Sequence, residues 1–275
     1  MIRFKWLLLV CFSCSVTLLV NGNPKGKLSE QIPQGNQWQG KSVAFLGDSM
    51  TQKRGEITSF WEYLQTMLGI EPFVYGVSGK QWNAIDDQAV KLLAEQPRVD
   101  AIVIFAGTND YNNNTPLGSF FEEGLRKVNA DGVFVERKYR TVVMNDSTFC
   151  GRINRAMSFL KENFPDQQII LMTPIHRGFA KFKETNVQPD ECHANALGLY
   201  LDDYVLKLKE ASNYWAVPLI DLHAECGLFP LSNSHAAYFS HVDTDRLHLS
   251  SLGNERLACV ICYKLLSMPS GFHRE

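Results

Sequence analysis

The apolar residues of this chain gather in short runs separated by amphipathic stretches. Five runs are rich in Val, Ile and Leu and apolar on both faces, which is typical of parallel strands covered by helices. They span residues 42–46, 72–76, 100–105, 168–173 and 216–221. Between them, apolar positions recur at helical spacing, as in Phe60, Leu64 and Met67. This alternation predicts an α/β fold, a three-layer αβα sandwich with a five-stranded parallel sheet.

Two long connections interrupt the alternation. Residues 111–150 follow the third strand and contain VFVERKYRTVVM, whose β-branched and aromatic content predicts an inserted hairpin. Residues 222–244 precede the last helix. Insertions of this size in a compact domain usually shape a binding site, although a solvent-facing decoration explains them nearly as well.

The first 22 residues differ in pattern from the rest. Arg3 and Lys5 precede a nearly unbroken apolar run that ends at Val20, and a polar stretch follows. This pattern predicts a secretory signal peptide over residues 1–22 and therefore an exported protein, periplasmic or secreted. With no repeat or clear linker in the remainder, we expect a single domain over residues 23–275.

A membrane span and a lipid anchor are the alternative interpretations of this segment. The apolar run is shorter than the roughly 20 residues that a spanning helix needs. Cys14 follows Ser13, but Cys11 and Phe12 before it make a poor lipid-attachment signal. We therefore favour export with neither a stable membrane span nor a lipid anchor.

Composition narrows the function mainly by exclusion. The chain has 275 residues and a net charge of −2, so no basic excess exists to neutralise nucleic-acid phosphates. Cys259 and Cys262 have the C-x-x-C spacing of redox and metal sites, but they lie on an apolar helical stripe with Leu257, Ile261 and Leu265. They are interpreted as core cysteines. No other zinc-ligand spacing occurs in the sequence, so we predict neither a metal nor a cofactor.

Polar residues with complementary chemistry follow the predicted strands. Ser49 comes just after the first strand, Gly79 after the second and Asn109 after the third. Asp245 and His248 stand three residues apart before the last helix. Ligands of open parallel sheets bind at the carboxyl ends of the strands. A nucleophile, a base with a carboxylate, and hydrogen-bond donors are what acyl transfer needs.

The segments around these residues resemble a known family. GDSM at 47–50, the block around Gly79, GTND at 107–110 and DRLH at 245–248 are similar, in order, to the four blocks of the SGNH, or GDSL-like, hydrolases. The resemblance implies a flavodoxin-like fold and a serine esterase mechanism without metal. Two departures are small: the second block lacks an asparagine often found before its glycine, and Leu249 replaces a frequent proline.

The resemblance also implies a role for each residue. Ser49 would be the nucleophile, His248 the general base and acid, and Asp245 its orienting partner. The backbone N–H groups of Ser49 and Gly79 and the amide of Asn109 would form the oxyanion hole. An imidazole, with an ordinary pKa of about 6.5, suits the task of a base at neutral pH.

Four further residues are candidates for the site. Ser78 lies next to a glycine but does not fit the G-x-S-x-G nucleophile elbow. Asp243 is an alternative partner for His248, although the family spacing favours the later aspartate. His176, at the end of the fourth strand, is expected to contact substrate, and His241 has no assigned role.

The substrate follows from weaker signals. An exported esterase without a long apolar lid fits acetyl esters of a polysaccharide or other small sugar esters better than lipids. The basic run RKYR at 137–140 could meet an acidic glycan or simply face solvent. Lysophospholipase or thioesterase activity, or a non-catalytic glycan-binding protein, are the alternatives. Four aromatic residues are expected to offer a stacking surface for sugar rings: Phe120, Phe121, Tyr238 and Phe239.

Overall fold

The structure, a computed structural model, describes residues 35–269 and 271–272, so the predicted signal peptide lies outside the described residues. Its centre is a five-stranded sheet with the order β2-β1-β3-β6-β9, in which every neighbouring pair is parallel. The predicted α/β sandwich is therefore confirmed. The strands are β1 (Ser42–Gly47), β2 (Glu71–Val74), β3 (Ala101–Phe105), β6 (Gln168–Met172) and β9 (Leu219–Ile220).

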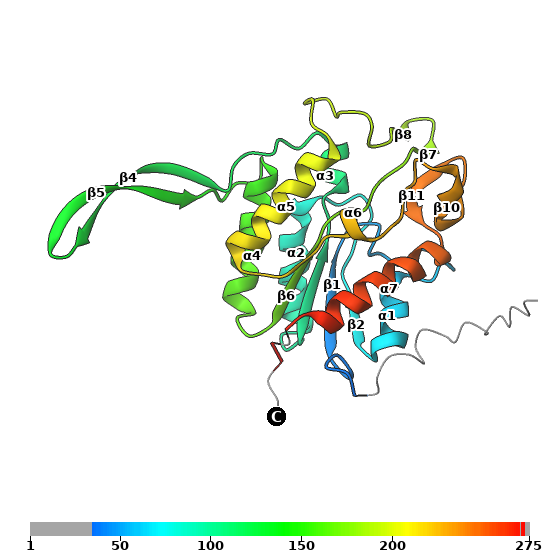
Figure 1. Ribbon diagram of the computed structural model, residues 1–275, viewed down its shortest axis with the longest axis horizontal. Helices are drawn as coiled ribbons and strands as arrows, with labels where there is room; N and C mark the ends of the chain where they lie inside the picture. Colours follow the sequence, from blue (N-terminus) through cyan, green and yellow to red (C-terminus); the bar gives the residue numbers. More distant parts are fainter. Residues whose placement is uncertain (1–34, 270, 273–275) are drawn as a thin grey trace, which may run out of the picture.

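Helices cover both faces of this sheet (Figure 1). Side chains that alternate along each strand enter two separate hydrophobic clusters, one on each face. One face is covered by α1 (Phe60–Leu68) and α7 (Ser251–Ser267). The other is covered by α2 (Ile85–Glu95), α4 (Phe149–Asn163) and α5 (Leu201–Trp215). Both faces are thus buried, which explains why the strands are apolar throughout.

The helical stripes read from the sequence are confirmed as core. Phe60, Leu64 and Met67 of α1 are buried, and the helix starts at a capping box in which Glu62 accepts a hydrogen bond from the backbone N–H of Ser59. The stripe of α7 is buried as well, and Cys262 belongs to it, whereas Cys259, also expected in the core, is only partly buried. The cysteines of the described residues are all free.

A second sheet was not predicted. It is antiparallel, has the order β10-β11-β7-β8, and lies beside the N-terminus of α7 (Figure 1). Its strands are only three to five residues long, and Ala180 of β7 pairs with Asp245 of β11 across a long stretch of chain. The strands are β7 (Ala180–Lys183), β8 (Asn186–Gln188), β10 (Phe239–His241) and β11 (Asp245–Leu249).

The predicted hairpin after the third strand is confirmed. It consists of β4 (Phe121–Ala130) and β5 (Val133–Val142), and it projects from the body of the molecule (Figure 1). The expected aromatic stacking surface is wrong in part, because Phe120 and Phe239 are buried in the two cores. Two short helices complete the fold, α3 (Thr108–Asn112) and α6 (Leu222–Glu225).

Candidate active site

Ser49 stands at the end of β1 because the turn there is tightly built. A Cβ on Gly47 would lie 2.3 Å from the carbonyl oxygen of Phe105, so only glycine fits where β1 and β3 come together. The side chain of Gln88 accepts a hydrogen bond from the N–H of Gly47 and donates one to its carbonyl, at 2.8 and 2.9 Å. Asp48 Oδ1 accepts from the N–H of Met50 at 2.9 Å. The nucleophile candidate is thus held at the carboxyl end of the sheet.

The structure brings Ser49, His248 and Asp245 together. His248 Nε2 lies 2.9 Å from Ser49 Oγ, and His248 Nδ1 lies 2.9 Å from Asp245 Oδ2. An ionised carboxylate only accepts, so Nδ1 carries the proton and Nε2 is free to accept the hydroxyl proton. Asp245 Oδ1 also accepts from the backbone N–H of His248 at 2.9 Å. All three side chains are buried.

Arg54 is a fourth member of this cluster. Its Nη2 lies 3.4 Å from Asp245 Oδ2, and its Nη1 donates to Ser240 Oγ. Burial alone would raise the pKa of Asp245, but the hydrogen bonds and charge of His248 and the charge of Arg54 outweigh it and lower the pKa. Asp245 is therefore held in its ionised, accepting form.

The three expected oxyanion donors follow β1, β2 and β3. Within the described part of the chain, the backbone N–H groups of Ser49 and Gly79 have no hydrogen-bond partner. Gly79 is exposed and has a φ of +74°, a conformation that favours glycine. Asn109 is buried, and its Nδ2 donates to Asp48 Oδ2 at 3.1 Å and to the carbonyl of Lys80 at 3.0 Å. To bind an oxyanion, the amide of Asn109 would have to give up one of these two hydrogen bonds.

Asp48 is a buried carboxylate next to the nucleophile. Burial raises its pKa to about 7, with the charge of Asp110 adding to the effect and the bonds from Met50 and Asn109 opposing it. Its side chain therefore changes charge near neutral pH while it holds the amide of Asn109.

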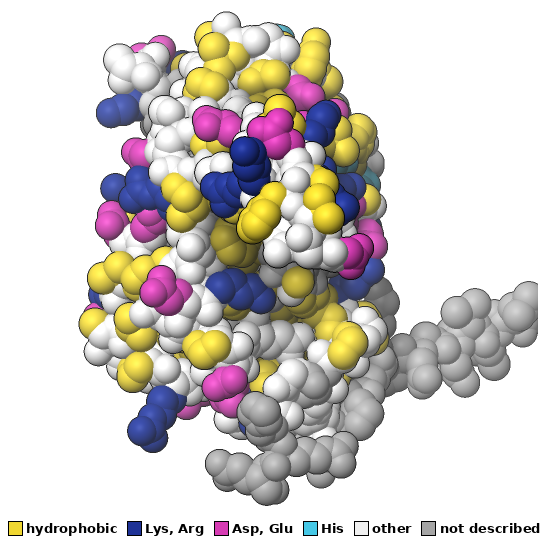
Figure 2. All heavy atoms as spheres, turned by 90° about the vertical axis from the view of Figure 1, so that its left-hand side faces the viewer, with side chains coloured by type: hydrophobic (Ala, Val, Ile, Leu, Met, Phe, Trp, Pro, Cys, Tyr) yellow, Lys and Arg dark blue, Asp and Glu magenta, His cyan; other side chains and the backbone are white. Residues whose placement is uncertain are grey.

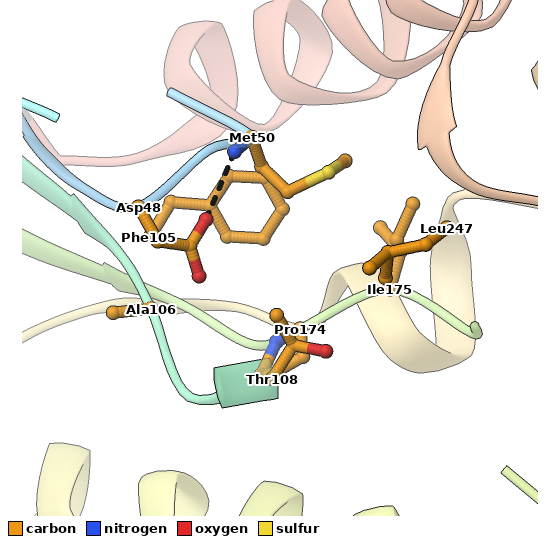
Figure 3. Close-up of a pocket in the computed structure, with 8 residues that line it drawn as sticks. All are labelled: Asp48, Met50, Phe105, Ala106, Thr108, Pro174, Ile175 and Leu247. Carbon is orange, nitrogen blue, oxygen red and sulfur yellow. Dashed lines mark hydrogen bonds between the residues drawn. The ribbon is translucent and has the colours of Figure 1, made fainter. Parts of the chain in front are cut away.

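Two small cavities lie near Ser49, one of them lined by Ser49 itself and the other by its neighbours Asp48 and Met50. One is lined mainly by apolar groups from the ends of β1, β3 and β6 and by Leu247, the neighbour of His248 (Figure 3). The other is lined by Ser49, His248 and Arg54 among others. The enclosed space beside the nucleophile is therefore small.

Comparison with known proteins identifies the family. The model of the GDSL-like lipase/acylhydrolase family matches residues 45–256, which is most of the chain and includes every triad candidate. The chain belongs to this family. A search of curated proteins found no match.

Solved structures agree with this GDSL-like hydrolase fold. A protein from Lactobacillus plantarum is 23% identical, with a TM-score of 0.63 over 82% of this chain and 97% of that one. A possible lipase from Chitinophaga pinensis is 17% identical, with a TM-score of 0.63 over the same shares. At these identities the likeness concerns the fold alone.

Not every residue singled out in this GDSL-like hydrolase joins the triad. His176 Nδ1 lies 2.6 Å from Glu191 Oε1, and its ring stacks on His223 with a centroid distance of 3.9 Å. No hydrogen bond or ring contact links His176 to the triad within the described residues. Asp243 is exposed and lines a separate cavity with Arg246. The geometry thus favours Asp245 over Asp243 as the partner of His248.

The two remaining alternatives also lie outside the triad. Ser78 is exposed, with its N–H bonded to Gln52, and His241 is exposed as well. Across the described ranges, no group of three His, Cys, Asp or Glu is placed to hold a metal ion. None of the helices described is both long and apolar enough to cross a bilayer.

Sequence reasoning missed Phe182 and Arg54. Phe182 is on β7, its ring centroid lies 5.3 Å from that of His248, and 42% of the residue is exposed. Arg54 and Phe182 reach the triad only through the tertiary fold, so neither spacing nor periodicity marks them. A weak signal was available for Arg54, since it follows the GDSM block by four residues.

Proposed function

We propose that this GDSL-like hydrolase is a serine esterase that removes short acyl groups, acetyl foremost, from a carbohydrate. The observation that carries the proposal is the chain of hydrogen bonds from Ser49 Oγ through His248 to Asp245, with 2.9 Å at each step. Serine becomes a useful nucleophile only when a base accepts its proton, and this chain supplies the base and its orienting carboxylate.

The first half of the reaction forms an acyl-enzyme. Ser49 Oγ attacks the ester carbonyl carbon as its proton moves to His248 Nε2, and the imidazolium is stabilised by Asp245. The oxyanion is met by the N–H groups of Ser49 and Gly79 and by the amide of Asn109. The tetrahedral intermediate then collapses, and the leaving alkoxide takes the proton from Nε2.

The second half releases the acid. Water gives a proton to His248 Nε2 and attacks the acyl carbon through the same oxyanion hole. Collapse returns the proton to Ser49 Oγ and frees the carboxylic acid. No group beyond the residues named is needed to balance these steps.

Two features support a short acyl group on a ring alcohol. The cavities beside Ser49 are small, and neither offers the extended apolar groove that a fatty chain requires. The half-exposed ring of Phe182 stands on the His248 side, where the alcohol leaves, and aromatic rings are good platforms for apolar ring faces. Export through residues 1–22 would place such an enzyme where polysaccharides are found.

An acyl-length series tests the proposal. We expect kcat/KM to fall steadily from acetyl to octanoyl p-nitrophenyl esters, and acetate to be released from acetylated oligosaccharides. Ser49→Ala should abolish both activities, while the matched variant Ser78→Ala, at an exposed serine, should leave them unchanged. A rise in kcat/KM along the series would instead indicate lysophospholipid or thioester substrates. Turnover by Ser49→Ala would exclude the mechanism itself.

A further inference from the structure

The hairpin of residues 121–142, here called the arm, is a well-formed element that is anchored to the body of the protein. Asn154 Nδ2 donates to the carbonyls of both Phe120 and Val143, each at 2.9 Å, and so fixes the root of the arm. At its tip, Asp131 and Gly132 have φ values of +54° and +85°, the conformation that two-residue hairpin turns need. Ten paired residues in each strand give a reach of roughly 34 Å.

Both faces of the arm expose apolar side chains, among them Leu125 and Phe134 on one face and Val133 on the other, but the two faces differ in how their charges are paired. Residues paired directly across the strands share a face, and on one face Glu123 forms ion pairs with Lys138 and Arg140. On the other face, here called the open face, Arg126 is paired directly with Arg137. Like charges directly opposite are destabilising, and no acidic side chain of the described chain forms an ion pair with either guanidinium.

The rest of the open face is largely apolar, apart from Glu122 and Thr141, which are paired at its root. Toward the tip it presents Val128 and Val133, which are 43% and 63% exposed, and nearer the root Tyr139, over which Arg126 stacks at 3.6 Å. The side of the molecule from which the arm projects shows hydrophobic and basic side chains close together, with acidic side chains among them (Figure 2). A two-stranded hairpin by itself is marginally stable in water. The open face, with its two arginines and its valines, would suit a partner surface that is apolar and acidic.

The exposed side of α5, next to the root of the arm, offers such groups in part. Leu206 is 60% exposed, and Tyr214, which packs on Phe121 at the root of the arm, is 38% exposed. Glu210 is exposed on the same side of the helix and forms an ion pair with Lys207. The overall charges are complementary as well. The arm carries five Lys and Arg against four Asp and Glu, whereas the rest of residues 35–275 carries 18 against 24.

We propose that the arm mediates a two-fold dimer, in which the open face of each copy lies on α5 of the other. The surface area that the arm could bury favours a second copy of this chain over an unrelated protein as the partner. One face of the arm, about 34 Å by 10 Å, covers roughly 340 Å². Two arms on two partners bury about 1,400 Å² in total, within the 1,200–2,000 Å² of stable interfaces. A single arm on another protein would bury half of that.

Molar mass in solution tests the dimer. Residues 23–275, which include every described element, are examined by sedimentation equilibrium from about 1 to 100 µM. We expect a dimer, and a monomer when residues 123–140 are replaced by Asn-Gly, since Glu122 and Thr141 are already paired. Triad activity of the shortened variant shows that its body is folded.

Matched point variants test the open face. Val133→Asp and Leu125→Asp both place a carboxylate at an exposed apolar position of the arm, on the open and the opposite face respectively. Only Val133→Asp should weaken the dimer, with a dissociation constant raised by about tenfold or more. Arg137→Glu should weaken it likewise, and adding Glu210→Arg should restore it. A wild-type monomer at 100 µM, or equal effects of the two face variants, would overturn the proposal. So would a shortened variant that stays dimeric.

Discussion

The ring of Phe182 lies 5.3 Å, centroid to centroid, from the imidazole of His248, yet 42% of Phe182 remains exposed. His248 is the group that would give its proton to the departing alcohol, so this imidazole marks the alcohol side of the ester. Phe182 therefore stands where the alcohol part of a substrate would lie, away from the acyl group.

This placement predicts a selective defect in Phe182→Ala. For a ring alcohol such as cyclohexylmethyl acetate, we expect kcat/KM to fall roughly three- to tenfold, because one aromatic contact contributes about 0.5–1.5 kcal/mol. For ethyl acetate, whose alcohol is too small to reach the ring, the value should hardly change. Steady-state rates of acetate release provide the measurement.

Phe179→Ala is the matched control for that experiment. Phe179 is a neighbouring aromatic residue, 39% exposed, that lines the separate cavity with Asp243 and Arg246. Phe179→Ala should leave kcat/KM unchanged for both acetate esters. An equal loss for both alcohols in Phe182→Ala would instead mean that Phe182 only positions His248.

The second prediction separates Asp245 from Asp243. Asp245→Asn should lower kcat by about 10³–10⁴, because an amide cannot hold the imidazole in the required tautomer. Arg54→Met should cost less than about tenfold, since its contact to Asp245 is long, at 3.4 Å, and partly exposed. Asp243→Asn, two positions away and exposed, should behave like wild type in the same p-nitrophenyl acetate assay. Should Asp243→Asn prove the more damaging change, the pairing seen here would not be the working one.

The third prediction concerns the oxyanion hole. Asn109→Ala should lower kcat by about 10²–10³ with little change in KM, because the amide would act mainly on the transition state. Asn113→Ala is the control, since Asn113 is a neighbouring asparagine whose amide donates to the backbone carbonyl of Asn109. A rise in KM with unchanged kcat in Asn109→Ala would assign the residue to ground-state binding.

The sheet and the triad could be predicted from the sequence because both depend on local patterns. Strands such as β3 are apolar on both faces, and a parallel sheet places the residues after each strand along one edge. Ser49 and Asn109 were found by that rule. The strand bounds were less accurate in β9, where α5 extends to Trp215 and only Leu219–Ile220 remain as strand.

The second sheet and its contribution to the site could not be predicted in this way. β7 and β11 are short, and their pairing joins residues far apart in the chain, such as Ala180 and Asp245. Phe182 sits in the polar stretch KFKET, which carries no strand periodicity. Phe120 and Phe239 were expected to be exposed, because their neighbours in the sequence are polar. Tertiary packing buries both rings.

The last prediction concerns Asp48 and the stability of the fold. Its pKa is about 7 in the folded protein, raised by burial, against an ordinary value of 3.8. The folded state therefore keeps this proton to higher pH than the unfolded state does. The stability linked to it is fully present below pH 4, is lost as the pH rises toward and through 7, and amounts to roughly 4 kcal/mol.

Replacing Asp48 by asparagine removes this ionisation while keeping an oxygen for the N–H of Met50. The free energy of unfolding of Asp48→Asn, relative to wild type, should therefore rise between pH 5 and pH 8.5, as measured by denaturant titration at both values. Asp100→Asn is the control: hydrogen bonds from Ser42 and the charge of Lys41 outweigh burial and lower the pKa of Asp100. Asp100 is thus ionised at both pH values, and its variant should show no such change. If the difference in unfolding free energy between Asp48→Asn and wild type is also the same at both pH values, the folded protein accommodates the Asp48 charge without penalty.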